Sequence, residues 1–212
     1  MSPALSLSPE SIHPTLWCGA QRAHATRRCI DTGHPELTAE LPGGGWPQGA
    51  FTELLVQQPG IGELRLLVPA LRALGSRPVM LINPPHLLQP LALGYWGLAS
   101  ASFCVLHAPK TADALWAAEQ ALRADSCGAV LLWQCTMRAE ALRRLSLAAQ
   151  HGQALCFLLR PLSAALNASP ALLRLTLTPA SAGVQLTLLK RRGSPRDEPL
   201  CVPLSPCPIL LS

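Results

Sequence analysis

Short apolar runs alternate with helix-like segments through the middle of this chain, and few folds accommodate that order. Several runs are short, apolar and bounded by turn residues, as buried strands are. They are 50–56, 77–83, 102–107, 128–134 and 153–160. Helical spacing fills the intervals, at 62–74, 86–99, 111–124 and 138–150. Such alternation produces right-handed crossovers, so it predicts a mostly parallel sheet covered on both faces.

The last third of the chain changes character. The runs 172–178 and 184–190 alternate apolar and polar residues around a turn, which predicts an antiparallel hairpin at the edge of the sheet. From Gly193 onward the chain is rich in proline, so we expect an extended or loosely docked tail. The chain therefore divides into a lead segment, 1–28, one core domain, 29–192, and a proline-rich tail, 193–212.

The composition favours a cytoplasmic protein with a binding partner. Only 14% of the residues are charged, against about 25% in an average soluble domain, which suggests adhesive outer faces. The net charge of +5 is compatible with nucleic-acid contact but forms no long basic run. The 8 cysteines include no CxxC pair, as expected of reduced thiols in a cytoplasmic protein.

Targeting and membrane segments are not expected. The first residues lack the basic and apolar regions of a signal peptide. The stretch 78–109 contains no Asp, Glu, Lys or Arg, yet prolines and glycines interrupt it before about 20 apolar residues accumulate.

The turn after the first expected strand lies where a phosphate-binding loop of ATPases would lie. In such a loop, backbone N–H groups hold the phosphates, a Lys neutralises charge and a hydroxyl binds Mg²⁺. Here the Lys and Ser/Thr positions hold Gly62 and Glu63, or Glu63 and Leu64 in a loop one residue longer. A carboxylate there would repel a triphosphate by more than about 1 kcal/mol. We therefore expect no nucleotide cofactor and no catalysis at this turn.

This degenerate loop consists of Pro59, Gly60, Ile61, Gly62 and Glu63. A plain tight turn before a helix is the favoured interpretation, and a relic anion site is the alternative.

Several segments resemble known families. Residues 30–33 (IDTG) and 43–49 (GGGWPQG) resemble the lead into the first core strand of RecA. The segments LPGGGWPQGAFTELL, PGIGELRLLVPAL, LWAAEQALR and LRRLSLAAQ, with the Asn-Pro-Pro-His step at 83–86, resemble the ImuA family of bacterial translesion-synthesis accessory proteins. The resemblance runs from about Ile12 to Arg192, and these pieces occur in order.

The resemblance implies a fold and a function. It implies an α/β, RecA-like three-layer domain with a degenerate Walker A loop and a C-terminal antiparallel hairpin. It implies a non-catalytic adaptor in SOS-induced mutagenic DNA synthesis that binds the Y-family-like protein ImuB, with RecA and an error-prone replicative-type polymerase as further candidate partners. Pro85 and Gln134 stand where the RecA pattern has a water-activating Glu and a Mg²⁺-side Asp.

Two other functions stay open at this stage. A SulA-like inhibitor of cell division would bind the division GTPase. A residual ATP-binding protein would use a cation from elsewhere in the chain.

Candidate contact residues fall into two groups. Arginines lie in or after the last two parallel strands, where RecA faces DNA, and could contact phosphates or simply be solvated. They are Arg138, Arg143, Arg144 and Arg160. Trp17 and Trp46 precede most of the core elements and are candidate anchors for a protein interface, while Trp133 should be core. DNA binding is in doubt, because the first of these loops is nearly absent.

One cluster has metal-ligand chemistry. Cys18, His24, Cys29 and His34 lie close together in the sequence, and zinc prefers such ligands. Their spacing lacks a short Cys pair, so no metal site is assigned.

Overall fold

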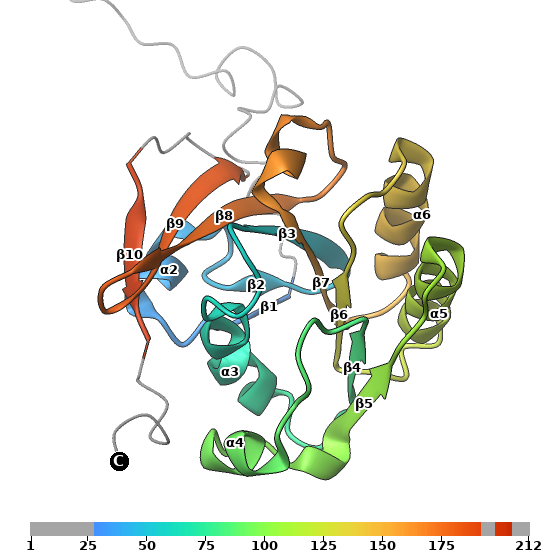
Figure 1. Cartoon of the computed structure of the whole chain (residues 1–212), viewed down its shortest axis with the longest axis horizontal. Coiled ribbons are helices and arrows are strands. Elements are labelled where there is room, and N and C mark those ends of the chain that lie inside the picture. Colours follow the sequence, from blue (N-terminus) through green and yellow to red (C-terminus); the bar gives the residue numbers. More distant parts are fainter. Residues whose placement is uncertain (1–27, 192–197, 205–212) are drawn as a thin grey trace, which may run out of the picture.

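A central sheet of mixed direction organises the molecule (Figure 1). The computed structural model describes residues 28–191 and 198–204. The sheet has 8 strands in the order β10-β9-β8-β3-β7-β6-β4-β5. Its strands are β3 (Ala50–Val56), β4 (Val79–Ile82), β5 (Phe103–Leu106), β6 (Ala129–Trp133), β7 (Leu155–Pro161), β8 (Leu173–Ala180), β9 (Gly183–Lys190) and β10 (Leu200–Pro203).

Strand β3 lies at the centre because its sequence is apolar along its whole length. Every residue of β3 is buried, and the strand pairs in parallel with β7 on one side and β8 on the other. The parallel pairing continues through β6, β4 and β5. The predicted hairpin is confirmed as β8 and β9, which pair antiparallel.

Helices cover both faces of the sheet, as the alternation predicts. They are α2 (Pro35–Glu40), α3 (Glu63–Ala73), α4 (Pro90–Tyr95), α5 (Thr111–Arg123) and α6 (Ala139–Ala149), with 3-10 turns η2 (Ser100–Ser102) and η3 (Leu162–Leu166). One apolar core lies between the sheet and α2, α3 and α4, and a second lies beneath α5 and α6. Figure 1 shows α5 and α6 side by side, away from α3 and α4. The protein is therefore a mixed α/β structure with a mostly parallel central sheet.

The segment expected to be one helix over 86–99 is mostly irregular. Helix α4 covers only six residues, Pro90–Tyr95. Proline fixes its own backbone and disfavours helix in the residue before it, so Pro90 can only begin the helix. Gly97 has a φ of 65°, a left-handed conformation that ends it.

The proline-rich tail contributes to the sheet. Strand β10 pairs antiparallel with β9, from Leu200 opposite Leu186 to Pro203 opposite Gly183. Proline is compatible with this position because β10 is an edge strand. A small second sheet pairs β1 (Cys29–Ile30) with β2 (Trp46–Pro47). Within the described ranges, no helix is both long and apolar enough to cross a membrane.

Candidate functional site

The turn between β3 and α3 forms the centre of the candidate site. It lies at the carboxyl end of a parallel strand, the edge where open α/β sheets bind ligands. Gly60 and Gly62 have φ values of 86° and 121°, which residues with a Cβ rarely adopt. These conformations turn two backbone N–H groups inward.

The carboxylate of Glu63 accepts hydrogen bonds from both of those N–H groups. The Gly60 nitrogen lies 2.8 Å from Oε1 and 3.1 Å from Oε2, and the Gly62 nitrogen lies 3.2 Å from Oε2. Glu63 is only 3% exposed although it is the first residue of α3. Backbone donors at a helix N-terminus are the groups that bind phosphate in nucleotide-binding loops. In this protein a side chain of the loop itself occupies them.

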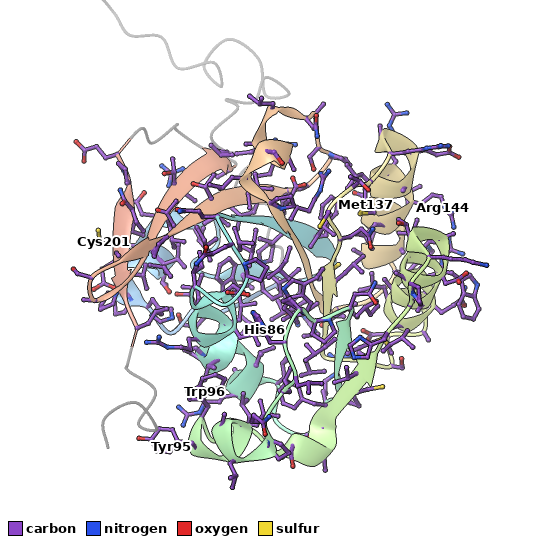
Figure 2. The ribbon with its side chains drawn as sticks, viewed as in Figure 1. His86, Tyr95, Trp96, Met137, Arg144 and Cys201 are labelled. Carbon is purple, nitrogen blue, oxygen red and sulfur yellow. The ribbon has the colours of Figure 1, made fainter. Side chains whose placement is uncertain are left out.

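An apolar cavity of about 140 Å³ lies beside this turn. Its lining includes Pro85, His86, Trp96 and Trp133, and Figure 2 shows His86 and Trp96 beside α3. Sites for drug-sized ligands usually enclose about 300–1,000 Å³. The cavity is therefore too small for a nucleoside triphosphate.

Arg65 is a cation that also lines this cavity, two or three residues after the position of a P-loop Lys. Its Nη2 donates a 2.8 Å hydrogen bond to the carbonyl oxygen of Leu204. The Leu204 side chain also packs close to Gly62. Arg65 thus holds the chain after β10 against the start of α3.

Two neighbouring loops are fixed by amide side chains. Asn83 donates to the Ala108 carbonyl oxygen at 2.9 Å and accepts from the Ala108 nitrogen at 2.7 Å, which ties the loop after β4 to the loop after β5. Gln134 donates to the Thr111 hydroxyl at 2.8 Å. Pro85 lies two residues after Asn83. Pro85 and Gln134 stand where the RecA pattern places carboxylates, and neither side chain carries a charge.

The structure separates Arg160 from the other predicted arginines. Arg160 is 3% exposed and its Nη1 donates to Glu53 Oε1 at 2.8 Å, so it belongs to a buried ion pair within the sheet. Arg138 and Arg143 are exposed at the start of α6. Arg144 donates to Glu119 Oε2 at 2.8 Å, and that hydrogen bond raises the pKa of the Arg144 guanidinium.

Trp46 is not an exposed anchor. It is fully buried and meets the Phe157 ring edge-to-face, with centroids 5.3 Å apart. The small β1–β2 sheet places Trp46 over the core, and this pairing is not visible in local sequence. Trp17 lies outside the described residues.

Sequence reasoning missed a group of exposed apolar side chains around α4. Leu87, Leu91 and Tyr95 are 80%, 84% and 60% exposed. The absence of charge in 78–109 was the available signal, but it could not show which side chains face outward. Trp116 on α5 is also exposed.

The cysteine and histidine cluster does not assemble in the described part of the chain. Cys29 and His34 are described, whereas Cys18 and His24 lie outside it. His34 contacts the Leu66 carbonyl oxygen through Nε2 at 3.1 Å. Among residues 28–191 and 198–204, no three His, Cys, Asp or Glu side chains gather as metal ligands would.

Comparison with known proteins finds similarity to SulA proteins. No protein-family model matches the chain. The cell division inhibitor SulA of Serratia proteamaculans is 30% identical over 125 residues, which cover 58% of this chain and 74% of that protein. The crystal structure of SulA from Pseudomonas aeruginosa is 33% identical and covers 52% of this chain and 97% of its own, with a TM-score of 0.43.

Proposed function

This chain belongs to the family of the cell division inhibitor SulA, and on that premise we propose that it is a non-enzymatic protein of the DNA-damage response that inhibits cell division by binding the division GTPase. The relationship to SulA carries this proposal. The Glu63 carboxylate on the Gly60 and Gly62 nitrogens supports its non-enzymatic part, because the donors that would hold a phosphate are already used.

A cytoplasmic location accompanies the proposal. Five of the described cysteines are free thiols, as a reducing compartment favours. These thiols are Cys104, Cys127, Cys135, Cys156 and Cys201.

An adaptor for an ImuB-like protein in translesion synthesis is the second candidate. The SulA match covers 58% of this chain, whereas the resemblance to the ImuA family runs from about Ile12 to Arg192. A RecA-like core would serve either candidate. The position of the Glu63 turn between the central strand and α3 supports that more specific fold.

Co-purification separates the two candidates. Tagged full-length protein is recovered from extracts of cells that have been exposed to a DNA-damaging agent. We expect the division GTPase in the eluate without an ImuB-like protein. Recovery of the ImuB-like protein without the division GTPase would replace the first candidate with the second.

A direct assay then tests the inhibition. The purified division GTPase is polymerised with GTP and followed by light scattering, with and without this protein. Inhibition is expected to saturate as the protein approaches the GTPase concentration. Normal polymerisation at a several-fold excess of this protein would contradict the proposal.

A further inference from the structure

A second cavity opens at the same edge of the sheet as the Glu63 turn. It encloses about 470 Å³, which is within the range of ligand sites. Residues following β3, β4, β5 and β6 contribute to its lining, together with the last residues of β7. We call it the Arg160 cleft, after the charged residue in its wall.

The wall of the Arg160 cleft carries an unbalanced charge. Glu53 Oε1 accepts from Arg160 Nη1 at 2.8 Å, and Glu53 Oε2 accepts from Arg174 Nε at 2.5 Å. The side chains of Arg160, Glu53 and Arg174 are 2%, 0% and 9% exposed. Two guanidinium groups thus share one carboxylate, which leaves a net charge of about +1 in a nearly dry place.

Two residues that line this cleft each carry a buried donor without an acceptor. Within the described residues, Arg160 Nε and Trp133 Nε1 are buried and have no hydrogen-bond partner. Arg174, unlike Arg160, has an acceptor besides Glu53, because its Nη2 donates to the Ala164 carbonyl oxygen at 3.0 Å. A buried donor without an acceptor is costly, above all on a charged group. The deficit in the cleft wall is therefore in acceptors and in negative charge.

We propose that the Arg160 cleft binds the carboxylate of an Asp or Glu side chain on a partner protein. One carboxylate supplies two acceptor oxygens and one negative charge, and its plane matches a guanidinium group. A phosphate group carries more charge than this cluster lacks. The exposed Gln57 and Gln58 side chains at the cleft offer amides that could pair with a peptide backbone.

This inference rests on the proposed function only in taking the carboxylate from a protein. The test uses the full chain and a short peptide, acetyl-Gly-Glu-Gly-amide, so a failure to bind the division GTPase does not affect it. Matched ligands are the same peptide with Gln in place of Glu, sodium acetate and inorganic phosphate at equal ionic strength. Binding is followed by NMR through the Arg Nε–H signals, which the Arg160→Lys variant assigns.

We expect the Glu peptide to give a saturable shift of the Arg160 Nε–H signal. We expect the Gln peptide to bind at least about tenfold more weakly. Arg160→Lys should weaken binding by a similar factor, whereas Arg138→Lys, an exposed arginine at the same edge, should leave it unchanged. If Arg160→Lys fails to fold, Cys135→Trp gives the same test, because Cys135 is exposed and lines the cleft.

Several results would overturn the proposal. Equal affinity for the Glu and Gln peptides would show that the cleft does not recognise a carboxylate. Acetate binding as tightly as the Glu peptide would mean that the ligand is a free small acid. Three further results would contradict the proposal equally. They are tighter binding of phosphate than of the Glu peptide, no response to any ligand, and full binding by Cys135→Trp.

Discussion

Two buried glutamates, one within the central strand β3 and one in the turn that follows it, are stabilised in opposite ways. Glu63 is satisfied by the backbone nitrogens of Gly60 and Gly62 within its own turn. Glu53 is held by Arg160 and Arg174, which lie on the strands either side of β3. The first arrangement is local and complete, whereas the second depends on the sheet and leaves a donor of Arg160 unused.

The difference concerns which hydrogen-bond donors stay available beside each glutamate. A side chain closes the Glu63 turn to phosphate, and the adjoining cavity is small. The Arg160 cleft keeps both volume and unpaired donors. The proposed carboxylate site therefore lies at the same sheet edge as a turn whose backbone donors are already used.

The largest effect is expected from Glu53→Ala. This change leaves two buried guanidinium groups without a carboxylate, which costs about 3–5 kcal/mol when one partner of a buried ion pair is removed. Urea unfolding measures the loss, with Glu140→Ala in the exposed first turn of α6 as the control. A loss below about 1 kcal/mol would show that the cluster is not buried as described.

Glu63→Ala should cost less, about 1.5–3 kcal/mol, the range for hydrogen bonds to a charged group. Gly60 is exposed, so water can replace the lost carboxylate at its nitrogen, whereas water cannot easily reach Arg160 and Arg174. The same urea experiment compares the two variants. A Glu63→Ala loss larger than that of Glu53→Ala would reverse the comparison.

A smaller effect concerns the reactivity of two thiols, one buried and one exposed. Burial raises the pKa of the Cys156 thiol on β7 from 9.0 to about 12, whereas Cys135 in the Arg160 cleft is exposed. A thiol reagent followed by peptide mapping should modify Cys135 rapidly and Cys156 only as fast as the protein unfolds. Equal rates would show that the core beneath α5 and α6 is open.

The raised pKa of the Cys156 thiol predicts that the free energy of unfolding depends on pH. Below pH 9 the Cys156 thiol is protonated in both the folded and the unfolded chain, so its contribution to stability is fully present. As the pH rises from 9.0 towards about 12, the unfolded chain loses the proton first and that contribution is lost. Cys156→Ala should therefore show a shallower alkaline fall in the free energy of unfolding than the unchanged chain.

The order of strands and helices was predictable from the sequence because apolar periodicity reports burial directly. The runs that became β3, β6 and β7 are continuous and apolar, as buried parallel strands require. The pairing of β10 with β9 could not be predicted, since a short strand among prolines has no periodicity of its own.

The site was predicted only in part. The sequence indicates that Glu63 replaces the groups that hold a phosphate, but not that its side chain folds back onto Gly60 and Gly62. The burial of Arg160 depends on Glu53 and Arg174, which lie far away in the sequence and adjacent in the sheet. Long-range register of this kind leaves no local signal.

The most direct test of the closed Glu63 turn is calorimetric titration of the purified protein with ATP and Mg²⁺. With the Gly60 and Gly62 nitrogens held by a carboxylate, we predict no saturable heat up to millimolar ATP. Micromolar affinity that disappears in a Gly60→Val variant would contradict the account, because it would show that triphosphate displaces Glu63 and occupies the turn.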